Sequence, residues 1–352
     1  MRRTSVVVLV SFLLAACGSA TLAPTADETT ASPTEAACSI SPLTGDCYEP
    51  DNPVVLVKID DVPAARPQLN LNVADIVIVE PVEYGLTRLM AVYNSVLPET
   101  VGPVRSARIT DIDLAAAFGR PGFAYSGSTS KLVPYLTSST MQLIGEPQGG
   151  TGYSRDASRY APHDLVANTS ELISRLSDLN AAKLTAGATW KFGELLTPGK
   201  IPVSVEAIWN SSRKSFVWSA SSKKWLISAD GSVTNSLTSS GLLERASATT
   251  IFIQQVDLLP SPFVFSDGSV TPYAKTTGSG AGWVLTQGQS FYGSWSRPTT
   301  ADLPQWFDKN GVEIAIQPGN VWWLIVDRVS STVRVEMPKP ANSPSATASK
   351  AD

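Results

Sequence analysis

The chain has 352 residues, of which 43% are hydrophobic and 16% are charged. This composition allows a sizeable buried core and excludes disorder along the whole length. The formal net charge of −4 argues against a nucleic-acid partner. A single histidine and three cysteines argue against a metal site, and we expect no cofactor.

Residues 1–16 have the pattern of a secretory signal peptide. Two arginines precede an apolar run over residues 6–16, which is about half of the ~20 residues needed to span a bilayer. The run ends in Leu14-Ala15-Ala16-Cys17-Gly18, which resembles the lipobox of bacterial lipoproteins. That resemblance implies acylation of the Cys17 thiol and cleavage just before it. The alternative is an ordinary signal peptide in which Cys17 has no special role.

Residues 17–49 are expected to form a lipid-anchored tether that carries a disulfide loop. The stretch 18–37 is small, polar and rich in Ser, Thr and Pro, so it has little to bury. Cys38 and Cys47 lie nine residues apart around a turn, and in an oxidising compartment such a pair indicates a disulfide. A redox or metal-binding pair is the alternative. The predicted location is the extracytoplasmic face of the cell membrane.

Residues 50–185 are predicted to form an α/β domain. The continuous apolar runs 54–57 and 76–79 are typical of buried strands, and 87–93 and 122–125 add two more. A helix is expected to begin at Gly102-Pro103 and to end near Gly119. A second helix is expected over residues 170–179, with Ser170 as its N-cap.

Residues 186–336 are predicted to form a smaller, mainly antiparallel all-β domain, which makes the protein α+β overall. Short strand-like segments recur there between Asn-, Gly- and Ser-rich turns. All nine tryptophans fall in this half, and core packing is a simpler explanation for them than a sugar-stacking surface. Residues 337–352 are expected to be a disordered tail.

Several short motifs resemble the YerB family of bacterial lipoproteins. The matching blocks are Ala65-Arg66-Pro67-Gln68, Ala74-Asp75-Ile76-Val77, Glu83-Tyr84-Gly85-Leu86-Thr87-Arg88, Gly102-Pro103-Val104-Arg105-Ser106-Ala107-Arg108 and Ala161-Pro162-His163-Asp164-Leu165. The resemblance implies an envelope lipoprotein with an N-terminal and a C-terminal domain of unknown function, and it transfers no activity. The family usually carries glycine where Asn70 and Tyr84 stand.

The arginines of these motifs are the candidate ligand-binding residues. On a helix starting at Pro103, Arg105 and Arg108 would share one face beside free backbone N–H groups, which suits an anion. Arg66 and Arg88 lie near acids in the sequence and belong to the same set. The structural alternative is that these arginines form buried ion pairs. Their expected internal partners are the strand-end acids Asp60, Asp61, Asp75, Glu80 and Glu83.

Material for catalysis is sparse. A hydrolase or transferase that modifies the cell wall would have to use His163, the sole histidine, with Asp60, Asp61 or Glu83 as the carboxylate. His163 could equally order its loop through a hydrogen bond. We therefore expect a binding protein first, whose ligand is an anionic cell-wall component or an envelope protein, and an enzyme second. A purely structural assembly factor is the third alternative.

Overall fold

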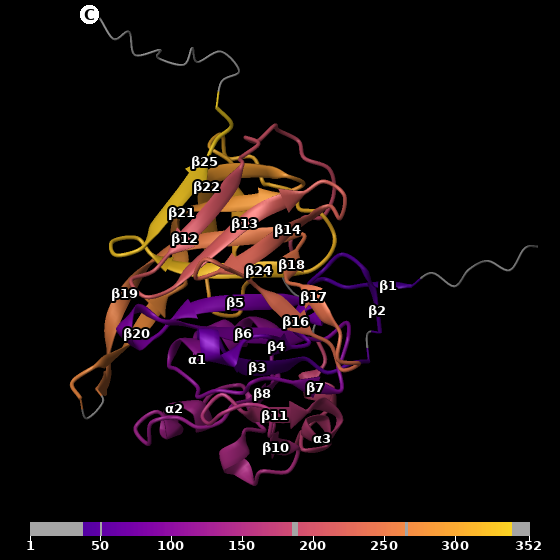
Figure 1. Ribbon diagram of the computed structural model, residues 1–352, viewed down its shortest axis with the longest axis vertical. Coiled ribbons are helices and arrows are strands. Elements are labelled where there is room, and N and C mark those ends of the chain that lie inside the picture. Colours follow the sequence, from indigo (N-terminus) through magenta and orange to yellow (C-terminus); the bar gives the residue numbers. More distant parts are fainter. Residues whose placement is uncertain (1–37, 50, 185–188, 265–266, 340–352) are drawn as a thin grey trace, which may run out of the picture. The chain divides into compact units, whose positions relative to one another are not determined.

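The computed structural model describes residues 38–49, 51–184, 189–264 and 267–339 (Figure 1). The predicted signal peptide, the lipidation site Cys17, the segment 18–37 and the tail from residue 340 lie outside the described residues. The described residues form one compact unit.

The largest sheet has eleven strands and draws them from both halves of the chain. In hydrogen-bonded order they are β23 (Gln305–Phe307), β22 (Gln289–Arg297), β21 (Gly278–Thr286), β19 (Thr250–Val264), β24 (Val321–Asp327), β5 (Ile76–Pro81), β6 (Thr87–Tyr93), β3 (Val55–Asp60), β8 (Gly122–Ala124) and β9 (Gln142–Leu143), with β20 (Val270–Lys275) beside β19. Strand β24 lies parallel to both β19 and β5. The two predicted domains therefore share one sheet.

Four smaller sheets complete the described part of the chain. The six-stranded sheet contains β15 (Ser232–Val233), β14 (Lys224–Ala229), β13 (Arg213–Ser219), β12 (Ser204–Ile208) and β25 (Thr332–Glu336), with β18 (Ser247–Ala248) beside β14. The others are β10 (Tyr153–Arg155), β11 (Leu165–Asn168) and β7 (Thr100–Val101); β17 (Leu243–Arg245), β16 (Asn235–Leu237) and β4 (Gln68–Leu69); and β1 (Ser39–Ile40) with β2 (Cys47–Tyr48).

The predicted α/β domain is wrong, and so is the prediction of an α+β protein overall, because the described residues are mainly β. The α-helices there are α1 (Thr110–Ala115), α2 (Val133–Thr137) and α3 (Thr169–Ser174), each of one or two turns. The apolar run 76–79 lies in β5, and the run 54–57 lies in β3 except for Val54, which directly precedes that strand. Both runs are buried on both faces of the sheet. The covering layer is largely a second sheet and loops rather than crossover helices, and the sequence pattern does not distinguish the two.

The helix predicted from Pro103 is also wrong. The Arg105 N–H donates to the Lys58 carbonyl at 2.8 Å, and the Asp60 N–H donates to the Pro103 carbonyl at 2.9 Å. Because these backbone groups bond to strand β3, they cannot form a helical turn, and α1 begins only at Thr110. The second predicted helix is present but short, and its N-cap is Asn168, whose side chain accepts from the Glu171 N–H.

Alternating residues of the central strands feed two apolar cores. Leu56, Ile78 and Met90 belong to one core, which includes residues of α1 and α2. Val57 and Leu89 belong to the other, which joins the large sheet to the six-stranded sheet. The strand pairs β5–β6 and β6–β3 are antiparallel, so the ends of all three strands meet where Pro81, Thr87 and Asp60 lie.

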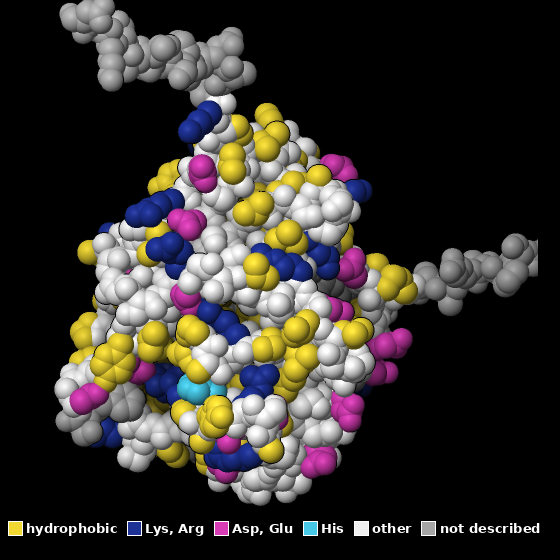
Figure 2. Space-filling view, in the orientation of Figure 1, with side chains coloured by type: hydrophobic (Ala, Val, Ile, Leu, Met, Phe, Trp, Pro, Cys, Tyr) yellow, Lys and Arg dark blue, Asp and Glu magenta, His cyan; other side chains and the backbone are white. Residues whose placement is uncertain are grey.

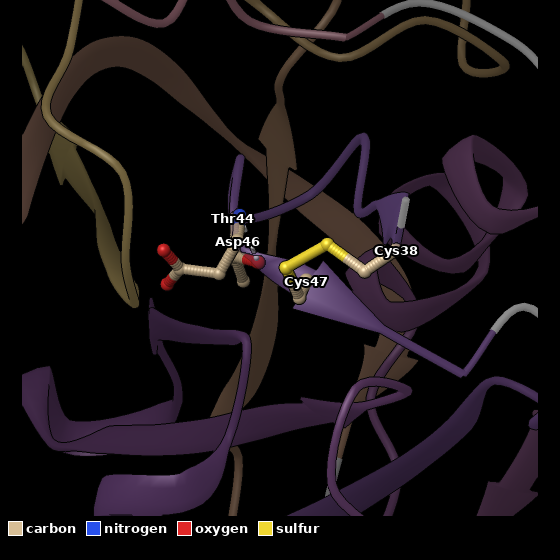
Figure 3. Close-up of a disulfide and its surroundings, with 4 residues drawn as sticks. All are labelled: Cys38, Thr44, Asp46 and Cys47. Atoms are coloured by element: carbon tan, nitrogen blue, oxygen red, sulfur yellow. Dashed lines mark hydrogen bonds between the residues drawn. A yellow bond between two sulfur atoms is a disulfide. The ribbon is translucent and has the colours of Figure 1, made fainter. Parts of the chain in front are cut away.

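Cys38 and Cys47 form a disulfide, as predicted, and close a short hairpin of β1 and β2 (Figure 3). Inside this loop the Asp46 N–H donates to the Thr44 hydroxyl at 3.3 Å. Leu43, at the loop tip, is 2% exposed and belongs to a hydrophobic core. Residues 38–48 are therefore docked onto the folded unit.

Candidate functional site

The end of strand β3 carries charged side chains on both faces of the sheet. Asp60 pairs in register with Arg88 on β6, and Arg88 pairs with Glu80 on β5, so the three side chains share a face. Lys58, two residues earlier on β3, lies on the same face. Asp61 points to the opposite face. Two charged clusters therefore lie back to back at this end of the sheet.

A cavity of about 250 Å³ opens beside the first cluster. We call it the arginine pocket and define it by Arg88, Arg105, Arg108, Asp60 and Glu83, all of which line it. Its remaining walls are Val62, Val82, Tyr84, Leu86, Thr87, Asp267 and Ser269. Three of the four predicted arginines thus meet at one cavity, although no helix presents them.

Arg108 forms a buried, two-pronged ion pair with Glu83. Its Nε lies 2.8 Å from Oε1 and its Nη2 lies 2.7 Å from Oε2, while the Thr271 hydroxyl donates to Oε1 at 2.6 Å. Burial raises the pKa of Glu83, but the hydrogen bonds and charge of Arg108 outweigh it, so the pKa lies below its ordinary value. This pair matches the structural alternative for the arginines.

Asp60 connects the candidate ligand site to the candidate catalytic residue. One of its oxygens, Oδ2, lies 3.0 Å from Arg105 Nε and 2.7 Å from His163 Nδ1. Asp60 is 2% exposed, whereas the Arg105 and His163 side chains keep 23% and 21% of their surface exposed. Figure 2 shows the one histidine, in cyan, between dark blue Lys and Arg side chains. A buried carboxylate therefore orients both groups toward solvent.

Arg88 differs from the other two arginines of the pocket. Its Nη1 donates to the Ser106 carbonyl at 2.9 Å, but no carboxylate of the described residues lies within ion-pair distance of it. Burial and the charges of Arg108 and Arg105 lower the pKa of Arg88 to about 9. Its register neighbour Glu80 is engaged elsewhere. Arg88 therefore places a positive charge at the pocket without an ion-pair partner among the described residues.

Glu80 is engaged by Lys58, a fully buried residue that the sequence analysis missed. Lys58 contacts Glu80 and also lies 2.8 Å from Asp111 Oδ1 at the start of α1. Burial lowers the pKa of Lys58 to about 8, although the neighbouring Asp111 carboxylate favours its charged form. A lysine within the apolar run of β3 was the available signal, because a buried lysine requires a paired carboxylate.

The second cluster holds Arg66 and Asp61, outside the arginine pocket. Arg66 Nη2 lies 2.6 Å from Asp230 Oδ2 and 3.5 Å from Asp61 Oδ1. Lys214 of β13 places its Nζ 2.7 Å from Asp61 Oδ2. These contacts join the end of β3 to the six-stranded sheet. Arg66 thus forms ion pairs within the protein, and Asp61 forms ion pairs with both Arg66 and Lys214.

Of the candidate catalytic residues, the structure brings together His163 and Asp60 only. Glu83 and Asp61 are each held by other partners. Within the described ranges, no hydroxyl is hydrogen-bonded to His163 and no three His, Cys, Asp or Glu side chains gather as a metal site. The arrangement is a carboxylate–histidine dyad without a side-chain nucleophile.

Tyr84 and Asn70 are two of the five non-glycine residues in the described ranges whose positive φ favours glycine. Tyr84, on the pocket wall, has φ 62°, and Asn70 has φ 53°. Side-chain contacts compensate here: the Tyr84 hydroxyl contacts Asp267 at the pocket rim, and Asn70 Nδ2 donates to the Thr100 carbonyl at 2.7 Å. The Tyr84–Asp267 contact therefore joins two residues of the pocket lining.

None of the helices in the described residues is long and apolar enough to cross a membrane. Residues 43–182 match the N-terminal domain of DUF3048, a family of proteins of unknown function, and residues 203–323 match its C-terminal domain. The Bacillus subtilis (strain 168) protein named "Putative lipoprotein YerB" is 48% identical over 64 residues, which span 18% of this chain and 19% of that protein.

The crystal structure of the YerB protein from Bacillus subtilis has the same fold. It matches with a TM-score of 0.69 at 23% identity and covers 84% of this chain and 99% of its own. The predicted resemblance to the YerB family is therefore confirmed. By both of its domains and by its fold, the chain belongs to the DUF3048 family, with YerB among its relatives.

Proposed function

We propose that this protein is a lipoprotein anchored through Cys17 on the extracytoplasmic face of the cell membrane, where it binds an anionic cell-envelope ligand in the arginine pocket. The lipobox-like sequence before Cys17 supports the anchor, and so does the name of the Bacillus relative. Two acyl chains give stable membrane attachment. The observation that carries the binding role is that Arg88 lines the pocket without forming an ion pair to any described carboxylate.

A partly buried guanidinium that forms no ion pair is unfavourable unless another anion approaches it. Arg88 has one hydrogen bond, to a neutral carbonyl, and Arg105 beside it uses only its Nε toward Asp60. The remaining N–H groups of both can donate to a phosphate or carboxylate, which arginine binds with two parallel hydrogen bonds. A cavity of about 250 Å³ holds such a charged group, while the rest of a larger ligand stays outside.

Calorimetric titration of the full chain with N-acetylmuramic acid and with glycerol phosphate tests this proposal. We expect binding of at least one, and a loss of tenfold or more in Arg88→Met. Arg328→Met is the matched control, because Arg328 is 64% exposed, pairs with Asp257 and lies outside the pocket. Equal affinity in Arg88→Met and the unchanged protein would refute the binding role of the pocket.

The His163–Asp60 contact favours a second candidate, a hydrolase or transferase that modifies the cell wall. A carboxylate 2.7 Å from Nδ1 orients the ring so that its other nitrogen can take a proton from water or a substrate hydroxyl. Release of soluble fragments from purified peptidoglycan measures this activity. The enzyme candidate requires turnover that His163→Asn abolishes while ligand binding remains. The absence of any turnover by the unchanged protein rejects it.

A further inference from the structure

A second and larger cavity lies in the C-terminal half and shares no lining residue with the arginine pocket. Its volume is about 680 Å³. Strands β21 and β22, the loop 197–200, the loop 308–310 and the end of β25 enclose it. We call it the aromatic groove and define it by Trp283, Tyr292, Phe291, Lys200 and Lys309.

The wall of the groove is aromatic and partly exposed. Trp283 and Tyr292 pair in register across β21 and β22, and their ring centroids lie 4.7 Å apart at an angle of 51°. Tyr292 is 58% exposed. Most tryptophans of this half are core residues, such as Trp225 and Trp323 at 0% exposure, so core packing explains them. Trp283, unlike these two, is only partly buried, and it lines the groove.

The rim of the groove is positive. Neither Lys200 nor Lys309 has an ion-pair partner among the described residues. The one acid that lines the groove is Asp308, and both of its carboxylate oxygens accept hydrogen bonds from residues of the two loops. Its Oδ1 accepts from the Asn310 and Val312 N–H groups at 2.8 and 2.9 Å, and its Oδ2 accepts from the Thr197 hydroxyl at 3.0 Å. Asp308 therefore fastens the two loops, and both lysines remain available to a ligand.

The loop 197–200 is fixed in place against the sheet. The Gly199 N–H donates to Gln289 Oε1 at 2.7 Å, and Lys200 exchanges backbone hydrogen bonds with Ser290. A Cβ on Gly199 would come within 2.7 Å of the Phe291 ring, so only glycine allows this close approach. The groove is thus built before any ligand arrives, which lowers the cost of binding.

We propose that the aromatic groove binds an acidic glycan, a sugar chain whose rings carry carboxylates. The C–H faces of pyranose rings pack against aromatic rings, and the Trp283–Tyr292 corner offers two such rings. The Asn310 amide and the loop backbone can bond to hydroxyls, while Lys200 and Lys309 complement the carboxylates. A purely apolar peptide would bury neither lysine favourably, and a neutral glycan would use neither charge.

Intrinsic tryptophan fluorescence and calorimetry on the full chain test the proposal with a tetrasaccharide of alternating N-acetylglucosamine and glucuronic acid. We expect saturable binding, at least tenfold tighter than for the neutral N-acetylglucosamine tetramer. Tyr292→Ala should weaken it tenfold or more, and Lys309→Ala should remove the preference for the acidic sugar. Tyr160→Ala is the matched control, because Tyr160 is 89% exposed and lies outside the groove.

The result is independent of the arginine pocket, since Arg88→Met should leave this binding unchanged. Equal affinity for the acidic and neutral tetramers, or full affinity in Tyr292→Ala, would overturn the proposal. So would a chain that binds neither sugar but forms a dimer in sedimentation experiments that Tyr292→Ala dissociates. In that case a second copy of the chain occupies the groove.

Discussion

Replacing Arg108 and Arg88 separately with Met distinguishes a structural arginine from a ligand-binding one. Arg108→Met leaves Glu83, which is 6% exposed, with the Thr271 hydroxyl as its remaining side-chain partner. Removing one member of a buried pair costs ~3–5 kcal/mol. Arg88→Met loses one hydrogen bond to the Ser106 carbonyl but also removes a partly buried charge that forms no ion pair. These effects oppose each other, so the net change should stay within about 1 kcal/mol.

Urea unfolding followed by circular dichroism measures both free energies of unfolding. Arg328→Met, at an exposed position, provides the baseline for changing an arginine to methionine. An unchanged dependence on urea concentration would show that the comparison concerns stability alone. If Arg88→Met costs as much as Arg108→Met, then Arg88 is a structural residue and the reasoning from its missing partner is refuted.

Four further outcomes are expected. Cys17→Ala should abolish metabolic labelling with a fatty acid, and unchanged labelling would exclude lipidation at this residue. Cys38 and Cys47 should resist alkylation in the secreted protein until a reductant is added, as mass spectrometry can show. The pKa of Glu83 is lowered in the folded protein. The stability that Glu83 contributes is therefore present above its unfolded pKa of about 4.3 and is lost as the pH falls through the folded pKa. The free energy of unfolding of Glu83→Gln should consequently depend less steeply on pH in the acid range. Asp267, an exposed acid at the pocket rim, repels anions, so Asp267→Asn should tighten binding of glycerol phosphate by about twofold, and weaker binding would contradict this.

The strands were the most predictable part of the fold. Continuous apolar runs located β3 and β5, because each of these strands is buried on both faces, and β6 was predicted as well. Their neighbours were not predictable. Strand β24 follows β5 by more than two hundred residues, yet it lies parallel beside it, and no local pattern encodes such a pairing. The α/β prediction failed at this point, because long-range pairing replaced the expected crossover helices.

The arginine pocket was partly predictable. The GPVRSAR block and the strand-end acids indicated an arginine–carboxylate cluster, and Arg105, Arg108 and Asp60 do meet. The sequence could not tell which acid serves which cation. Asp60 and Asp61 are neighbours in the chain but lie on opposite faces, because successive side chains of a strand alternate. That alternation places Arg66 in a separate cluster, away from the three arginines of the pocket.

The most direct test of the binding role is a crystal structure of the protein soaked with N-acetylmuramic acid. The account predicts that the ligand carboxylate lies in the arginine pocket within hydrogen-bonding distance of the Arg88 guanidinium, while Arg108 keeps its pair with Glu83. A pocket that holds only water, with the Asp60 or Glu80 carboxylate turned onto Arg88, would contradict it.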